Sequence, residues 1–479
     1  MTSNLVFPGP DTWARHFANK ISDFLDRNSP ILITTPEVGH LGDAAEPIYF
    51  GLLKARRDNK KLLVLYSPAL FWKFRIKIVN PEIYDLESDY CYSPTDLTGR
   101  LLRWFWVALF GSLKIVYLMW RKCLRLLQLA RPSYVLGSFD WYTAPDIGRS
   151  TLWKPAGVSY FSWDCATVDR WEKEFNEYLP VRLSREKLRR GEKLRLKAGI
   201  PSSDWFACLH VRSSGYYNDR SDLQAAPRNG HIENYVQAIR AITKAGGRVV
   251  RLGDSSMAPL PAMERVVDLT QSPFNNGLFN VYLMSQCRFF FGTNSGPELT
   301  CTKLFQKPSV TTDLPGLVMF PSMKKGDLAI FKHVYSRSRG RFLSLKERLE
   351  APGQYERGAF YCTMADDYIL QDNTPEEIYD VIEEFLARAP GAPYSDLQKI
   401  FNEARKDQIR RFLNEELVEK APVLISQSVF VEEQYHLATY CAHGGTLGQK
   451  YLEQNWQANV LNVAKYVPTV VTAARSLHS

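Results

Sequence analysis

Two side chains able to bind an anion stand at the end of an apolar stretch in the middle of the chain. The segment WFACLHVR (205–212) predicts a β-strand, and His210 and Arg212 share one face at its end. A guanidinium group there can hold a diphosphate through two parallel hydrogen bonds, and an imidazole can add another. The structural alternative pairs Arg212 with a nearby carboxylate and satisfies His210 inside the sheet.

A second candidate segment joins the apolar strand CRFFFGT (287–293) to a helix. Pro297 suits the first turn of that helix, where free backbone N–H groups and the helix dipole favour an anion. The segment matches neither GxGxxG nor the Walker A pattern, so it does not indicate a dinucleotide or ATP. Ordinary helix capping is the alternative. The residues expected to contact a ligand are Thr293, Asn294, Ser295, Gly296 and Glu298.

The stretch RVVRLGD (248–254) is a third place where polar residues stand at the end of a predicted strand. Arg251 and Asp254 lie where the predicted strand passes into a tight turn. Asp254 either binds a ribose or a base edge, or it caps the turn that follows.

The loop PEVGHLGD (36–43) follows the first predicted strand and carries a possible general base. It places Glu37, His40 and Asp43 around two glycines that permit close approach of a ligand. A histidine oriented by a carboxylate is a common general base near neutral pH. The alternative makes Asp43 a helix N-cap and His40 an ordinary loop residue.

These segments belong to a predicted series of strands separated by helices, which indicates parallel βαβ units. We expect an N-terminal Rossmann-like domain over 1–185, a C-terminal one over 186–390, and a helical extension over 391–479, with a cleft between the two α/β domains. Charged helix 182–199 connects them, and Thr374 begins a helix as its N-cap. The predicted strands are 31–35, 61–66, 133–139, 158–163, 205–212, 248–254, 265–270, 287–293 and 308–312.

Composition excludes several other classes of protein. The 479 residues are 45% hydrophobic and 23% charged, which excludes a disordered, collagen-like or coiled-coil chain. The net charge of +9 favours phosphate-bearing partners or an anionic membrane surface, without indicating nucleic acid. The cysteines form no CxxC pair and predict buried free thiols, and no secretory signal is recognised, so we expect a cytoplasmic protein. No spacing of His, Cys or acidic residues predicts a metal site, and no cofactor is expected.

One helix, predicted over 101–125, combines aromatic and basic residues. Arg103, Lys114, Arg121 and Arg125 fall on one stripe of a helical wheel whose remaining positions are mostly apolar. Three interpretations remain open: a core helix with its basic edge in water, a helix lying in an anionic membrane interface, and a membrane span.

The motifs together resemble a known class of enzyme. His210-x-Arg212, the RLGD turn and FFFGTNSGPELT resemble the nucleotide-sugar half of fucosyltransferase-like GT-B glycosyltransferases, in particular a bacterial family of surface-polysaccharide synthesis. The first-loop GHLGD resembles that of GT-B enzymes with a base after the first strand. The resemblance implies that Arg212 and His210 bind the donor diphosphate, that Arg251 and Asp254 lie near the nucleoside, and that Thr293, Asn294, Ser295, Gly296 and Glu298 contact phosphates, ribose or sugar.

We therefore expect a metal-independent, inverting glycosyltransferase that is cytoplasmic or peripheral on the membrane. Its donor would be a GDP- or UDP-sugar, its acceptor a glycan or lipid-linked glycan, and its base His40, oriented by Asp43 or Glu37. Two other interpretations stay open: a nucleotide-sugar epimerase or hydrolase of the same fold, and a non-enzymatic nucleotide-sugar-binding scaffold.

Overall fold

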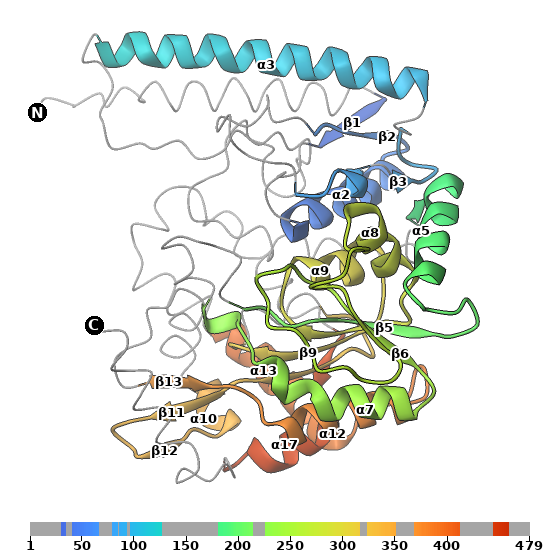
Figure 1. Ribbon diagram of the computed structural model, residues 1–479. Coiled ribbons are helices and arrows are strands. Elements are labelled where there is room, and N and C mark those ends of the chain that lie inside the picture. The colour runs from blue at the N-terminus through green and yellow to red at the C-terminus, as the bar shows by residue number, and fades with distance from the viewer. Residues whose placement is uncertain are drawn as a thin grey trace, which may run out of the picture. The chain divides into compact units, whose positions relative to one another are not determined.

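The computed structural model describes residues 30–34, 41–66, 79–84, 86–92, 96–126, 181–213, 226–316, 323–350, 368–411 and 444–458. The chain divides into two compact units (Figure 1). Unit 1 comprises residues 1–184 and 423–435, and unit 2 comprises residues 185–422 and 436–479.

Unit 1 contains a βαβ element near its start. Strand β1 (Ile31–Thr34) and strand β2 (Lys61–Val64) pair in parallel, and helix α2 (Leu41–Arg57) joins them. Helix α2 buries apolar residues at helical spacing, among them Ile48 and Leu52, against the two strands. These elements confirm the strands and helix predicted for this stretch. The predicted strands at 133–139 and 158–163 lie outside the described residues.

The predicted aromatic and basic segment forms helix α3 (Leu97–Leu126) of unit 1. Arg103, a member of the predicted basic stripe, turns toward the end of β2: its Nε donates to the carbonyl of Val64 at 3.0 Å, and its guanidinium lies 5.1 Å from the ring centroid of Tyr66. This part of the stripe therefore attaches the helix to the sheet.

The shorter described elements of unit 1 are η2 (Pro81–Tyr84), β3 (Leu86–Glu87) and β4 (Arg182–Leu183), of which β3 and β4 pair antiparallel.

Unit 2 is built around a seven-stranded parallel sheet in the order β14-β10-β9-β8-β5-β6-β7. The α/β class with a parallel sheet, predicted from the sequence, is confirmed. The strands are β5 (Phe206–His210), β6 (Arg248–Arg251), β7 (Val266–Asp268), β8 (Phe289–Thr293), β9 (Ser309–Leu314), β10 (Leu328–Phe331) and β14 (Thr446–Leu447).

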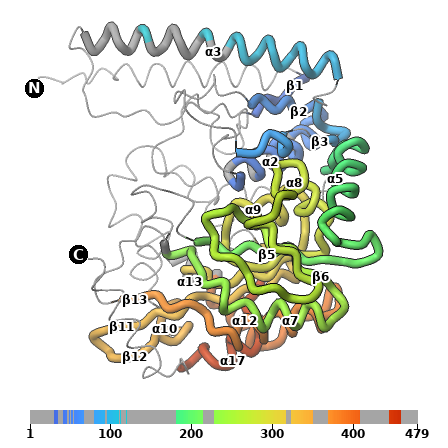
Figure 2. The backbone as a smooth tube through the Cα atoms, in the orientation of Figure 1, coloured from blue at the N-terminus to red at the C-terminus, as the bar shows by residue number. Residues whose placement is uncertain are grey.

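Helices cover both faces of this sheet, as Figures 1 and 2 show. One face packs against α7 (Val236–Lys244) and α12 (Pro375–Ala387), and the other against α8 (Gly277–Gln286), α9 (Gly296–Leu299) and the π-helical turn η7 (Thr300–Leu304). Helix α5 (Arg185–Lys197) packs on α8. Two short 3-10 turns, η5 (Ala226–Arg228) and η6 (Ile232–Tyr235), precede α7.

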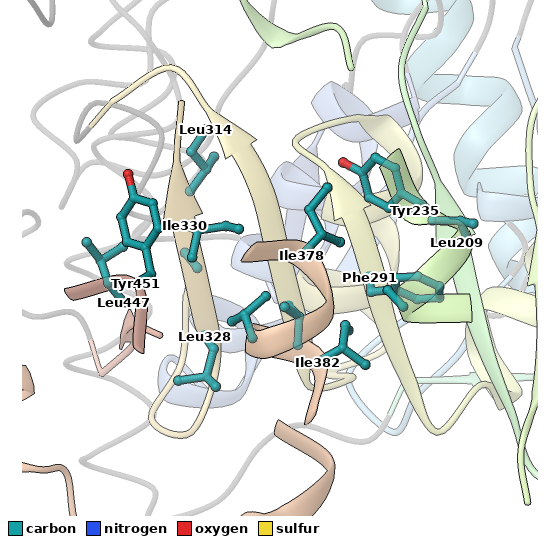
Figure 3. Packing of buried hydrophobic residues seen from close by; sticks show 14 of the residues in the cluster. Leu209, Tyr235, Phe291, Leu314, Leu328, Ile330, Ile378, Ile382, Leu447 and Tyr451 are labelled. Carbon is teal, nitrogen blue, oxygen red and sulfur yellow. The ribbon is translucent and has the colours of Figure 1, made fainter. Parts of the chain in front are cut away.

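The alternation of side chains along β8 shows why all three phenylalanines of this strand are buried. Phe289 and Phe291 face the α7 and α12 side, where Ile378 and Ile382 pack against the strands (Figure 3). Phe290 faces the opposite side and is also fully buried. A central strand of a sheet that is covered by helices on both faces is apolar along its whole length, as the sequence of β8 shows.

The C-terminal stretch is helical in α13 (Asp396–Arg411) and α17 (Gln449–Asn455), as expected, but it also supplies strand β14 at one edge of the sheet. The two-residue strand is too short to leave a periodic pattern in the sequence. A separate three-stranded sheet joins β11 (His333–Ser336), β12 (Arg341–Phe342) and β13 (Tyr368–Gln371), with α10 (Leu345–Glu350) beside it in the chain. Among the described cysteines, Cys91, Cys208, Cys287 and Cys301 are free thiols, as predicted.

Candidate functional site

The strand order of unit 2 reverses between β5 and β8. From β5 the chain adds β6 and β7 on one side, and it then crosses to β8, β9 and β10 on the other side. In open parallel sheets, ligands bind beyond the carboxyl ends of the strands at such a reversal point. The two segments predicted to bind phosphate follow these two strands, and their ends lie side by side because His210 pairs in register with Gly292.

The ends of β5 and β8 are in direct contact. Gly292 has φ of +134°, and a Cβ added there would lie 2.1 Å from the carbonyl oxygen of His210. Only glycine allows this approach. Just beyond this pair, the backbone N–H of Arg212 donates to Thr293 Oγ1 at 2.8 Å. Thr293 itself is fully buried and thus fixes the path of the Arg212 segment.

His210 is buried and uncharged. Burial, together with the neighbouring charges of Arg212 and Arg251, lowers its pKa to about 3. Its Nδ1 and the hydroxyl of Ser213 are both buried and have no hydrogen-bond partner among the described residues. Such orphaned buried groups are uncommon and costly, and a ligand that bonds to them removes the cost. Arg212 is partly exposed beside them.

The segment after β8 satisfies most of its polar side chains internally. Ser295 caps α9, its side chain accepting a hydrogen bond from the backbone N–H of Glu298. The Glu298 carboxyl group is buried and accepts from Asn294 Nδ2 at 3.1 Å and from Thr302 Oγ1 at 3.3 Å. Burial raises the pKa of Glu298 to about 8, so this group is largely protonated at neutral pH. Thr293, Asn294, Ser295 and Glu298 therefore shape the loop, and Gly296 is its partly exposed member.

Arg251 differs from Arg212, although the sequence placed both in the same candidate set. Its guanidinium is buried; Nη1 donates to Asp268 Oδ2 at 3.1 Å and to the carbonyl of Ala258 at 2.6 Å, and Nε has no hydrogen-bond partner among the described residues. Asp254 accepts from the backbone N–H of Ser256 at 2.8 Å, which is the turn-capping alternative. Both side chains take part in the folding of their own loop.

The predicted base lies mostly outside the described residues. Glu37 and His40 fall in the undescribed stretch 35–40. Helix α2 begins at Leu41, which places Asp43 in its first turn; the described structure does not include its side chain. Within the described ranges, no cluster of three or more His, Cys, Asp or Glu residues could hold a metal ion.

One group near the site was not predicted from the sequence. His231, which precedes η6, pairs with Asp372, and Asp372 also pairs with Lys332 at the end of β10. The strand β10 was not recognised in the sequence, so Lys332 could not be placed after a strand end. The stretch LAIF, followed by Lys332, is the signal that could have found it.

Comparison with known proteins adds little to this geometry. No family model and no curated protein matches the chain. It is similar to the dodecameric iron-containing heptosyltransferase TibC in complex with ADP-D-β-D-heptose, at 14% identity and a TM-score of 0.27. It is also similar to the glycosyltransferase TibC from enterotoxigenic E. coli H10407, at 12% identity and a TM-score of 0.24.

Each of these two matches covers 59% of this chain and 58% of the other, so the chain matches less than two thirds of either TibC structure. TM-scores this low do not establish a common fold. The functional argument therefore depends on the site itself.

Proposed function

We propose that this chain is a glycosyltransferase that moves a sugar from a nucleoside-diphosphate donor to a glycan or lipid-linked glycan. The observation that carries the proposal is the open polar edge at the strand-order reversal of unit 2. There Arg212 lies beside His210 Nδ1 and Ser213 Oγ, two buried atoms without a partner among the described residues. A donor diphosphate supplies the acceptor oxygens that an imidazole N–H, a hydroxyl and a guanidinium need.

In the proposed reaction an acceptor hydroxyl attacks the anomeric carbon of the donor. A C–O bond forms there, the bond from that carbon to the β-phosphate oxygen breaks, and the hydroxyl proton passes to a base. Arg212 stabilises the charge that develops on the departing nucleoside diphosphate. His40, with Asp43 or Glu37, remains our candidate for the base in an inverting reaction. Since Arg212 supplies the positive charge, we propose that no divalent ion is needed, and a chelator should leave the rate unchanged.

A thermal-shift screen across ADP, GDP, UDP and their sugars tests the donor proposal. A ligand at 100 times its Kd stabilises the folded state by about 2.7 kcal/mol, a readily measured shift. A GDP- or UDP-sugar is the donor class that the sequence motifs favour. Stabilisation by no nucleoside diphosphate would contradict the proposal, and sugar release or isomerisation without an acceptor would replace it with a hydrolase or an epimerase.

Helix α3 supports a second, finer proposal, namely peripheral contact with an anionic membrane. One face of α3 carries exposed apolar side chains, of which Trp104 is 77% exposed. Its sequence holds arginines and lysines but no aspartate or glutamate. Such a helix suits the interface of an anionic bilayer. Among the described helices, none combines the length and apolarity needed to cross a bilayer. The exposed apolar residues of α3 are Leu97, Leu101, Trp104, Phe105, Leu109 and Met119.

Cosedimentation with vesicles tests this contact. The double variant Trp104→Ala/Phe105→Ala should lose most binding to phosphatidylglycerol vesicles, and Leu196→Ala, which removes an exposed leucine of α5, should not. Equal binding of both variants would contradict the membrane proposal and leave the donor proposal intact.

A further inference from the structure

A second histidine lies at the same edge of the sheet, in a very different environment from His210. The side chain of His231 is 76% exposed, and its Nδ1 lies 2.6 Å from Asp372 Oδ2. The other carboxylate oxygen of Asp372 pairs with the buried Lys332. Asp372 is thus held from two sides, and it fixes the orientation of the imidazole.

The segment that carries His231 is attached directly to the proposed donor site. Lys332 Nζ donates to the carbonyl of Asn229 at 2.6 Å, and the backbone N–H of Gly230 donates to the carbonyl of Arg212 at 3.0 Å. A Cβ added to Gly230 would lie 3.1 Å from Thr293 Cγ2. The residue directly before His231 therefore touches both segments that follow β5 and β8.

The charges around His231 favour its protonated form. The hydrogen bond to Asp372 raises the pKa of His231, and the negative charges of Asp372 and Glu233 raise it further. Partial burial of the ring and the positive charge of Lys332 act in the opposite direction but are outweighed. The Nε2 atom of this imidazole has no hydrogen-bond partner among the described residues.

A purely structural role of His231 does not account for this arrangement. The segments before α7 and α12 are already joined by Asn234 Nδ2, which donates to the carbonyl of Asn373 at 3.0 Å. A hydrogen bond that only joins these two segments also does not require the imidazole ring of His231 to be exposed. An oriented, exposed imidazole with a raised pKa, directly after the Gly230 that bonds to Arg212, is better explained by binding of an anion at the proposed donor site.

We propose that His231 is a binding residue of the donor site, whose Nε2–H donates to a phosphate oxygen of the nucleoside diphosphate beside Arg212, with Asp372 as its positioning residue. The inference depends on the proposed function and deepens it. It gives the site two histidines with different roles: His210 as a neutral hydrogen-bonding group and His231 as a cation.

Calorimetric titration with ADP, GDP, UDP and inorganic pyrophosphate between pH 6 and 8.5 tests the role of His231. His231→Gln retains an amide that can bond to Asp372 but removes the charge. It should weaken binding of the best nucleoside diphosphate about tenfold at pH 6, the size expected for a hydrogen bond to a charged group. Glu233→Gln, which changes a nearby charge without touching the ring, should change affinity less than threefold.

The pH profile separates binding from structure. The contribution of His231 is present below its raised pKa and is lost as the pH rises through it, so wild type and His231→Gln should converge toward pH 8.5. Asp372→Asn should move this convergence to lower pH. Equal affinity and equal pH profiles for wild type and His231→Gln would overturn the inference while leaving the donor site standing. No binding by the wild type would contradict the donor site itself.

Discussion

Two neighbouring strand ends of the same sheet, each marked by an arginine, differ in how their polar groups are satisfied. At the end of β6 and β7, Arg251 is buried and bonds to Asp268, which also accepts from the backbone N–H groups of Leu260 and Thr270. At the end of β5, His210 Nδ1 is buried without a partner among the described residues, and Arg212 is partly exposed. We call the first cluster closed, because Asp268 pairs with a guanidinium and two backbone N–H groups, although Arg251 Nε has no partner among the described residues. We call the second open, because two buried polar atoms, His210 Nδ1 and Ser213 Oγ, lack a partner there beside a partly exposed arginine.

The difference teaches how to separate a structural polar cluster from a binding one. Removing a member of a closed cluster leaves its partner buried and unpaired, so the expected loss is in stability. Removing the unpartnered His210 imidazole leaves no hydrogen-bond partner of its Nδ1 unpaired among the described residues, so the expected loss is in ligand binding. Variants of the two clusters test this contrast, and we expect the largest effect at Arg212.

Arg212→Ala should remove transfer activity almost completely. Losing a charge-assisted contact to a diphosphate costs about 3 kcal/mol, or on the order of 100-fold in kcat/KM. The backbone N–H that bonds to Thr293 is retained, so the free energy of unfolding should change by less than about 1 kcal/mol. Steady-state kinetics and denaturant unfolding measure both. Arg288→Ala, an exposed arginine at the amino end of β8, is the matched control and should keep full activity.

Asp268→Ala should act in the opposite way. It leaves two backbone N–H groups without their acceptor, and it removes the carboxylate partner of the buried Arg251 guanidinium, which among the described residues keeps only the carbonyl of Ala258. Since Asp268 is itself partly exposed, we expect a loss of about 2–3 kcal/mol in the free energy of unfolding, below the full effect of breaking a buried ion pair. Urea unfolding measures it. A change below about 0.5 kcal/mol would show that this cluster is not closed.

His210→Leu replaces the unpartnered imidazole by an apolar side chain of similar size. Because the buried Nδ1 makes no bond to the described residues, the free energy of unfolding should stay within about 1 kcal/mol of wild type or rise. Affinity for the nucleoside diphosphate should fall about tenfold, since one hydrogen bond in the site is lost. Strong destabilisation without loss of affinity would identify His210 as a structural residue.

Glu298→Gln should change the pH dependence of stability. The pKa of Glu298 is about 8 in the folded state, against about 4.5 for a glutamate exposed to water. Between these values the folded state keeps a proton that the unfolded state has released, so stability falls as the pH rises. Glutamine mimics the protonated form, and the variant should show a flatter curve from pH 5 to 8 in urea unfolding. Glu264→Gln, at an exposed position, should keep the wild-type slope.

Much of the sheet of unit 2 could be predicted from the sequence because its signals are local. The apolar run of β8 and the capping box that Thr374 and Glu377 form at the start of α12 both appear as predicted. Strand β10 was not predicted, although LAIF is a short apolar signal for it, and β14 could not be predicted. LAIF is short and is not followed by a clear helix, and the two residues of β14 are placed in the sheet by pairing with Leu328 and Ala329.

The candidate site was predicted in part. Strand ends showed where His210 and Arg212 would lie, and the parallel pairing of β5 with β8 brings the two predicted segments together. The sequence could not show that Arg251 has a partner, because Asp268 is seventeen positions away and joins it only through the pairing of β6 with β7. For the same reason, the sequence could not show that His231 pairs with Asp372, which lies 141 positions away.

Hydrogen–deuterium exchange with and without the best-binding nucleoside diphosphate tests the central claim most directly. If the open end of β5 and β8 holds the ligand, peptides covering 211–213 and 293–299 will exchange more slowly when it is added, and peptides at the amino ends of the same strands, such as 286–288, will not change. Slower exchange confined to other parts of the chain would contradict the placement of the donor site.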